Sequence, residues 1–167
     1  MIPIRDYIPT HRFPLVTVSV IVINVGVYLF QGLLEIAGGI EWFIYTFGVV
    51  PYRVVHQFDL FTALTFITSM FMHGGLLHIL SNMLYLWIFG NNVEDRLGRF
   101  RFSLFYLLSG IIASLAQVLA DTSSRSPGIG ASGAIAGVLA AYLVLYPRAR
   151  IATLVPLGFF LRVAELP

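Results

Sequence analysis

Long apolar runs separated by short charged segments are the feature that most constrains this chain. The run Phe102–Ala120 contains no charged residue, and the segment just before it is densely charged. The hydrocarbon core of a bilayer is about 30 Å thick, and a helix of roughly 20 apolar residues crosses it. Of the 167 residues, 58% are hydrophobic and 11% are charged, which excludes an ordinary soluble domain. The pattern therefore predicts a polytopic membrane protein.

The apolar runs predict an all-α helical bundle that forms a single membrane domain over residues 1–167. We expect helical spans at about residues 13–30, 76–90, 102–120 and 132–146. Residues 31–75 are predicted to form a long outer loop. Residues 31–60 are too polar to span, although aromatic residues among them can rest at the membrane interface, and the apolar run 61–72 is short. Residues 151–167 are predicted to start a fifth span, so the bundle is expected to be incomplete.

The basic residues predict an orientation. All ten are arginine: seven lie in segments on the side of the N-terminus, two lie on the opposite side, and Arg162 lies near the end of the chain. Because positive residues favour the cytoplasmic side, we expect a multi-pass integral membrane protein with a cytoplasmic N-terminus, in a cell membrane of bacterial type. The net charge of +2 is too small and too dispersed to indicate nucleic-acid binding.

Two residue types are missing, and each excludes a class of chemistry. The chain has no cysteine, which rules out disulfides, thiolate metal sites and thiol nucleophiles. It also has no lysine, so neither a Schiff base nor a Ser–Lys dyad can form within these residues.

The last helical run is short and follows a polar, glycine-rich loop. A helix over residues 132–146 would rise only roughly 22 Å, so one end of it would lie below the membrane surface. Ser132 would open this helix, where backbone N–H groups lack intrahelical partners. It can be read either as a nucleophile beside an oxyanion hole or as an N-cap in a tightly packed helix. The hydrolase pattern G-x-S-x-G is not met, because Ala134 replaces its last glycine.

Small residues recur on two of the predicted helices. Gly133 and Gly137 form a small face on the short helix, and Ser109 and Ala113 belong to a similar stripe on the span 102–120. We expect the Gly133/Gly137 face to pack against a helix that these 167 residues do not contain.

A second polar pair lies on the span 76–90. His78 and Asn82 are four residues apart and therefore share one helix face. An imidazole and a carboxamide together offer hydrogen-bond donors suited to a developing oxyanion. The same pair could instead hydrogen-bond neighbouring helices and fix their packing.

Taken together, these motifs resemble those of the rhomboid intramembrane serine proteases. The run His73-Gly74-Gly75-Leu76-Leu77-His78-Ile79-Leu80-Ser81-Asn82 is similar to that family's H-G-G-x-x-H-x-x-x-N signature. Val93–Gly98 resembles the family's turn after the second span, and Gly130-Ala131-Ser132-Gly133 resembles its G-x-S-G motif. The order and spacing of these motifs fit nearly the whole chain.

This resemblance implies a six-helix bundle that hydrolyses peptide bonds of transmembrane protein substrates in a water-filled cavity. It assigns Ser132 as the nucleophile and His78, Asn82 and the Ser132 backbone N–H as oxyanion donors. Gly130 and Gly133 belong to the nucleophile motif, and Glu94 and Arg96 would hold the inner turn by pairing with each other. No metal and no organic cofactor is implied.

The resemblance also raises the question of the catalytic base. In rhomboids a histidine from the sixth helix serves as base, whereas the histidines here are His11, His56, His73 and His78. We therefore expect residues 1–167 to be the N-terminal part of such a protease and to be inactive alone. A rhomboid-like pseudoprotease that binds or chaperones transmembrane segments is the alternative, and a transporter fragment with a broken-helix site is a third reading.

Overall fold

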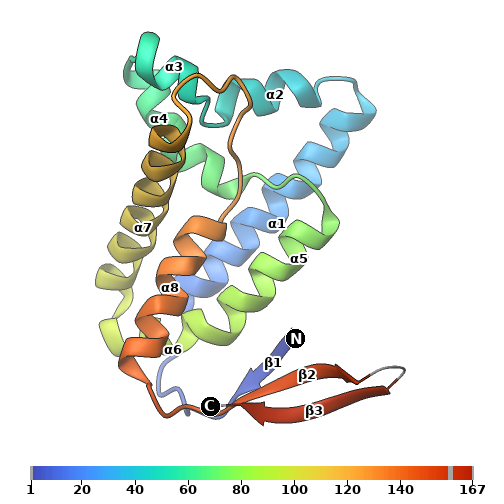
Figure 1. The fold of residues 1–167 in the computed structure, drawn as a ribbon, viewed down its shortest axis with the longest axis vertical. Helices are drawn as coiled ribbons and strands as arrows, with labels where there is room; N and C mark the ends of the chain where they lie inside the picture. Colours follow the sequence, from blue (N-terminus) through green and yellow to red (C-terminus); the bar gives the residue numbers. More distant parts are fainter. Residues whose placement is uncertain (1, 158–159, 167) are drawn as a thin grey trace.

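The computed structural model describes residues 2–157 and 160–166 as a helical bundle with a small sheet at one end (Figure 1). The longer helices lie side by side, short helices gather at the end opposite the sheet, and the N-terminal strand lies in the sheet. The elements are α1 (Leu15–Ile36), α2 (Ile40–Phe47), α3 (Pro51–His56), α4 (Leu60–Thr68), the 3₁₀ turn η1 (Ser69–Phe71), α5 (Leu76–Tyr85), the π-helical turn η2 (Leu86–Gly90), α6 (Asn91–Leu97), α7 (Arg99–Ala120), α8 (Ser132–Leu145), β1 (Ile2–Asp6), β2 (Ile151–Leu157) and β3 (Phe160–Leu166).

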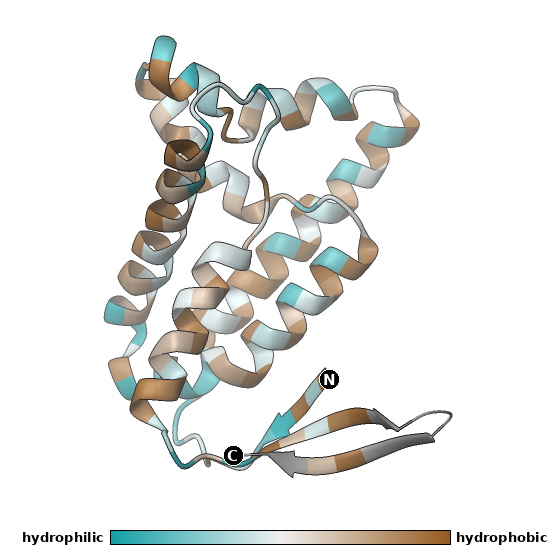
Figure 2. Ribbon diagram, viewed as in Figure 1, coloured by the Kyte–Doolittle hydropathy of each residue, from teal (hydrophilic) through white to brown (hydrophobic). Residues whose placement is uncertain are grey.

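The predicted helical membrane bundle is confirmed. Within the described residues, α1 and α7 are each long and apolar enough to cross a membrane. The pair Leu60–Phe71 and Leu76–Leu97, bent by 83° at its break, would make a third span if it counts as one. Figure 2 shows hydrophobic residues along most of α1 and α7. With 14 residues, α8 is too short to cross alone.

The segment that was expected to be a long loop, residues 31–75, is largely helical. The first ten residues after Gly38 already include α2, and α3 and α4 follow in close succession. Local signals explain two of the helix starts: Pro51 occupies the first turn of α3, and the Asp59 carboxylate accepts a 2.7 Å hydrogen bond from the Thr62 N–H at the start of α4. The segment expected to be a long loop therefore contains α2, α3 and α4.

The start of a fifth helical span, expected at residues 151–167, is also wrong for the residues that the structure describes there. β2 pairs antiparallel with both β1 and β3, in the order β1-β2-β3. Asp6 lies opposite Ile151 and Ile2 opposite Leu154. The β-branched residues Ile151, Thr153 and Val155 favour an extended chain, and the N-terminal strand supplies a hydrogen-bonding partner. Residues 158, 159 and 167 lie outside the described part.

Helices α7 and α8 pack closely through their small residues. A methyl group added at Gly137 would collide with Ser109, and one added at Gly133 would collide with Ala113. The Gly133/Gly137 face thus packs against α7, a helix of this chain, and the expectation of a helix from elsewhere was wrong. Glycine is needed at these positions because the two backbones approach within the space of a side chain.

The turn between α6 and α7 is held differently from the predicted Glu94–Arg96 pair. Gly98 adopts a φ of 80°, which favours glycine, and its N–H donates to the Glu94 carbonyl at 2.8 Å. The buried Glu94 carboxylate accepts hydrogen bonds from the N–H groups of Val16 and Thr17 and from the Thr17 hydroxyl, at 2.8–2.9 Å. Glu94 therefore satisfies the first N–H groups of α1, and Arg96 remains exposed.

Candidate active site at the start of helix α8

The polar segment between α7 and α8, residues 121–131, carries the chain from one end of the bundle to its middle (Figure 1). Three contacts with distant parts of the sequence hold this entry loop. Val49 and Gly128 exchange two backbone hydrogen bonds of 3.0 and 2.7 Å. The Tyr52 N–H donates to the Ser124 carbonyl, and the Gly130 N–H donates to the Ser69 carbonyl, both at 2.9 Å. The loop is thereby fixed to η1, to α3 and to the residue Val49 just before α3.

Ser132 is the first residue of α8, the position that the sequence predicted for it, and its side chain is exposed. Gly130, two residues earlier, has a φ of 125°, which favours glycine. A Cβ at Gly130 would lie 2.9 Å from Nε2 of His78 and 3.8 Å from Oγ of Ser132. The imidazole and the hydroxyl thus flank the same point, and Gly130 leaves the space between them open.

The environment of His78 indicates which ring nitrogen carries the proton. The half-buried His78 lies in the first turn of α5, and its Nδ1 lies 3.4 Å from the backbone N–H of Gly74, a long hydrogen bond in which Nδ1 must accept. A neutral imidazole that accepts at Nδ1 carries its proton on Nε2. His78 therefore presents an N–H donor toward the space next to Ser132.

Asn82 lies one turn further along α5 and is 7% exposed. Its amide nitrogen Nδ2 is buried and has no hydrogen-bond partner among the described residues. A buried donor without an acceptor is costly and calls for an explanation, such as a ligand that is bound during function. The assignment of Asn82 and Ser132 to one oxyanion site stays a prediction.

The loop that precedes α5 is fixed by a residue of α1. The buried Gln31 accepts from the His73 N–H at 3.0 Å and donates to the His73 carbonyl at 3.2 Å. The His73 ring in turn contacts the His78 ring edge-on, with 5.0 Å between ring centroids. Sequence reasoning missed Gln31, because its partner lies 42 residues away.

A cavity of about 230 Å³ adjoins Ser132 on the side of α7. Such a volume is sufficient for several water molecules. Among the residues that line it are the polar side chains of Ser69, Ser114 and Gln117. Sequence reasoning missed these residues too, although one signal was present. Positions 110, 113, 114 and 117 line the cavity and have the i, i+3, i+4, i+7 spacing of one helix face.

Comparison with known proteins bears on this geometry. The rhomboid domain family matches residues 60–165, well over half of the chain, and the match includes His78, Asn82 and Ser132. The chain belongs to the rhomboid family. The resemblance inferred from the sequence motifs is thereby confirmed.

Several curated rhomboid relatives are similar to this chain. Rhomboid-like protein 11, chloroplastic, of Arabidopsis thaliana is 32% identical over 121 residues, which are 72% of this chain and 39% of the relative. Presenilin-associated rhomboid-like protein, mitochondrial, of Homo sapiens is 37% identical over 86 residues, or 50% of this chain and 23% of the relative. Rhomboid protein 1, mitochondrial, of Saccharomyces cerevisiae is 35% identical over 104 residues, which are 60% of this chain and 30% of the relative.

These comparisons set the scope of what is known about this rhomboid. The chain spans between 23% and 39% of the length of these three relatives. Their names place them in chloroplasts and mitochondria, so they lend no support to the expected cell membrane of bacterial type. Membership of the family and membrane-spanning helices are established, and the catalytic chemistry is a separate question.

Proposed function

We propose that this chain carries the nucleophile and the oxyanion-stabilising face of an intramembrane serine endopeptidase that cleaves transmembrane segments. The observation that carries the proposal is the position of His78, whose Nε2–H faces the space that Gly130 leaves open beside the Ser132 hydroxyl. A donor and a hydroxyl close to one open point match the requirement of acyl transfer, in which negative charge develops near the attacking oxygen.

In this proposal a general base takes the proton of the Ser132 hydroxyl and Oγ attacks the carbonyl carbon of the scissile peptide bond. The carbonyl oxygen becomes an oxyanion and accepts hydrogen bonds from Nε2 of His78, from Nδ2 of Asn82 and from the Ser132 backbone N–H. The C–N bond then breaks, and the leaving amine takes up that proton as the acyl-enzyme forms. Substrate binding would supply the acceptor that the buried Asn82 amide lacks. Water for the second half of the reaction, hydrolysis of the acyl-enzyme, would be drawn from the cavity lined by Ser114 and Gln117.

The proposal places the general base outside residues 1–167. To act as base, His78 would need an unprotonated Nε2, and its ring proton would then be on Nδ1. Nδ1 faces the Gly74 N–H, so two donors would point at each other and the hydrogen bond would be lost. The other three histidines occupy positions 11, 56 and 73. Without a base, the Ser132 hydroxyl is a poor nucleophile at neutral pH.

A rhomboid-like protein that binds transmembrane segments without hydrolysis is the second candidate. One observation favours it: Ser132 makes no hydrogen bond to a basic side chain among the described residues. Both candidates use the same cavity and the same membrane-embedded face, and they differ only in whether Ser132 reacts.

The deciding experiment is cleavage of a transmembrane reporter by the full-length protein in liposomes. We expect Ser132→Ala to abolish cleavage and Asn82→Ala to lower the rate about a hundredfold, since one oxyanion donor contributes on the order of 3 kcal/mol. Ser103→Ala is the matched control, because Ser103 is half-buried on α7 and its hydroxyl bonds only the Arg99 carbonyl of its own helix. Reporter binding without cleavage, unchanged by Ser132→Ala, would establish the binding protein instead.

We also propose that the N-terminus faces the cytoplasmic side, or its equivalent in an organelle. Eight arginines, including Arg162 of β3, belong to segments at the end of the bundle that carries β1 and the α6–α7 turn, against Arg53 and Arg125 at the other end. This asymmetry follows the positive-inside rule. Cysteine accessibility at Thr10 and at Ser123, in an otherwise cysteine-free chain, tests it: reagent added outside should label only the second position.

A further inference from the structure

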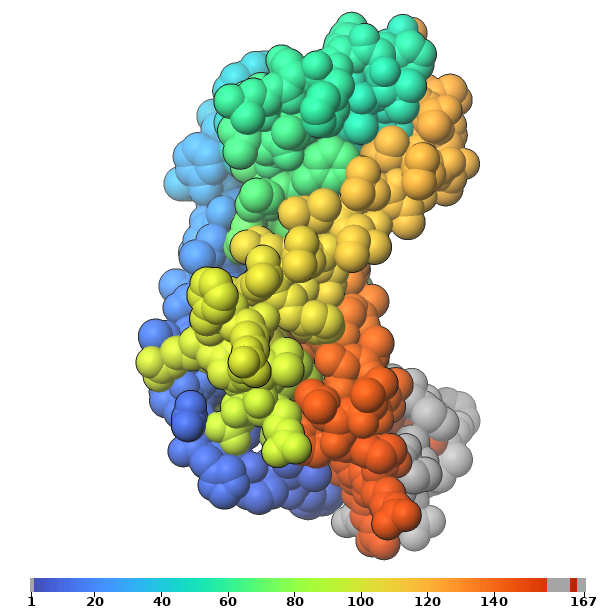
Figure 3. Space-filling view, turned by 90° about the vertical axis from the view of Figure 1, so that its left-hand side faces the viewer, coloured from blue at the N-terminus to red at the C-terminus, as the bar shows by residue number. Residues whose placement is uncertain are grey.

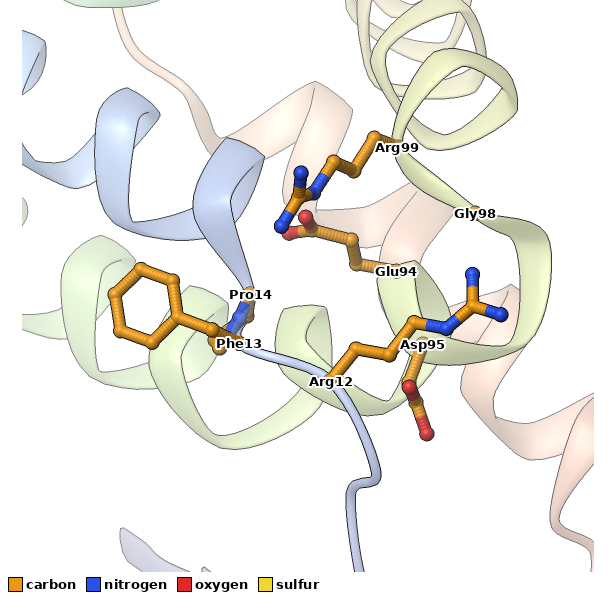
Figure 4. Close-up of a pocket in the computed structure, with 7 residues that line it drawn as sticks. All are labelled: Arg12, Phe13, Pro14, Glu94, Asp95, Gly98 and Arg99. Atoms are coloured by element: carbon orange, nitrogen blue, oxygen red, sulfur yellow. The ribbon is translucent and has the colours of Figure 1, made fainter.

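We propose that Arg12 and Arg99 bind the phosphate of an anionic phospholipid at the end of the bundle opposite the entry loop. Their side chains line an open cavity of about 530 Å³ between the segment before α1 and the α6–α7 turn. Figure 4 shows Arg12 extending from the N-terminal segment and Arg99 from the start of α7. In Figure 3 the same N-terminal segment, in blue, lies beside the yellow-green residues near position 100.

The two arginines lack partners, whereas the two carboxylates of the cavity have them. Glu94 is buried and accepts three hydrogen bonds from Val16 and Thr17. Asp95 accepts a 3.0 Å hydrogen bond from the His11 N–H. Within the described part of the chain, the guanidinium groups of Arg12 and Arg99 form no hydrogen bond and no ion pair within 4.0 Å. Each guanidinium offers five N–H donors and no acceptor, so a negatively charged hydrogen-bond acceptor is the partner that these two groups can bind in the cavity.

A neighbouring cavity adds a further arginine close to the first. A second cavity of about 570 Å³ shares Arg12 and Asp95 with the first and adds Arg96 and His11 to its lining. Phosphate oxygens match the planar fork of arginine in a bidentate geometry, which lysine cannot offer. Arg12 and Arg99 come from separate segments and line the same cavity, so each can contribute guanidinium donors to a phosphate bound there.

The position of the cavity indicates a lipid rather than a free anion. The cavity lies where α1 and α7, the two long spans, begin, which is the level of lipid headgroups. Phe13 is 64% exposed and Phe100 is 82% exposed beside the two arginines. Exposed aromatic residues at this level contact the headgroup and upper acyl region. Basic pockets at helix ends on the arginine-rich side are typical sites for anionic headgroups. A soluble phosphate would gain nothing from the two aromatic rings.

The test measures thermal unfolding of the full-length protein in neutral detergent, with short-chain phosphatidylglycerol, short-chain phosphatidylcholine or inorganic phosphate added. We expect phosphatidylglycerol to raise the unfolding midpoint by mass action and the other two additives to leave it unchanged. In Arg12→Gln/Arg99→Gln the apparent affinity for phosphatidylglycerol should fall at least tenfold, since hydrogen bonds to charged groups are lost.

The control is Arg53→Gln/Arg125→Gln, which makes the same change of charge at the other end of the bundle and should keep the wild-type affinity. Equal losses in both double variants, or equal stabilisation by inorganic phosphate, would overturn the proposal. If the Arg12/Arg99 double variant does not fold, Arg12→Lys and Arg99→Lys keep the charge and remove the planar fork. Each substitution should weaken phosphatidylglycerol binding without changing the unfolding midpoint measured without lipid. If both variants bind phosphatidylglycerol as the wild type does, the proposed role of the two arginines is refuted. None of these measurements depends on proteolysis.

Discussion

Glu94 is the residue whose substitution best tests the observed packing of the bundle. Its carboxylate holds the start of α1 through three hydrogen bonds of 2.8–2.9 Å, in a site where only 3% of the residue is exposed. In Glu94→Gln one oxygen becomes an NH₂ group that faces N–H and O–H donors. At least one hydrogen bond to a charged group is lost and one buried donor is left unsatisfied, which together amount to about 2–4 kcal/mol of unfolding free energy.

The matched control is Arg96→Gln. If Glu94 were held by Arg96, as the sequence suggested, both substitutions would break the same pair and destabilise the protein similarly. Because the Arg96 side chain is exposed and forms no hydrogen bond or ion pair within 4.0 Å among the described residues, we expect its substitution to change the unfolding free energy by less than about 0.5 kcal/mol.

The assay is reversible unfolding by SDS in mixed micelles without added lipid, followed by circular dichroism. Thr17→Val completes a double-mutant cycle with Glu94→Gln, and the coupling between the two should be about 0.5–3 kcal/mol. A loss for Arg96→Gln as large as that for Glu94→Gln, or no coupling between Glu94 and Thr17, would refute the capping role of Glu94.

Two further predictions concern packing and pH. Gly137→Ala should lower the unfolding free energy by about 1–3 kcal/mol, because the new methyl group meets Cβ of Ser109. Gly26→Ala is the control: a Cβ there has nothing within 4 Å, so the change should be neutral or stabilising by up to about 1 kcal/mol. Equal effects of the two substitutions in the same unfolding assay would contradict the close α7–α8 contact. Burial raises the pKa of the Asp6 carboxyl, against the opposing hydrogen bonds from Tyr142 and Asn92, so the folded state binds more protons than the unfolded state. Relative to Asp6→Asn, the unfolding free energy of the wild type should be constant above the raised pKa and should increase as the pH falls through it. If the difference in unfolding free energy between the two proteins does not change with pH, this burial is contradicted.

The parts of the fold that could be predicted are those with strong local signals. The uncharged run that forms α7 and the loop that ends at Ser132 are visible in the sequence alone, because apolar length and glycine-rich turns act locally. The helices α3 and α4 also had local signals in Pro51 and Asp59. The first was overlooked because its surroundings are too polar to span, and the second because its apolar run is short.

The parts that could not be predicted depend on partners far away in the sequence. Residues 151–157 are apolar, which suggested the start of a span, but the strand follows from pairing with residues 2–6 at the other end of the chain. Likewise Glu94 has an arginine two positions away, yet its partners in the fold are 77 and 78 residues away. The candidate site combines both cases: Ser132, His78 and Asn82 stand in recognisable motifs, whereas Gln31 and Gln117 matter only through contacts that the fold creates.

The small-residue contact between α7 and α8 also sets the depth of the candidate nucleophile. The helices run antiparallel, with Gly137 against Ser109 and Gly133 against Ala113, so a step of four residues on one matches four on the other. Extending this register by one residue places Ser132 level with Ser114, and both indeed line the same cavity. Ser114 lies six residues before the end of α7 at Ala120, so Ser132 lies about 9 Å below that end. Any substitution that changes the α7–α8 register therefore moves Ser132 relative to His78, which belongs to a different helix.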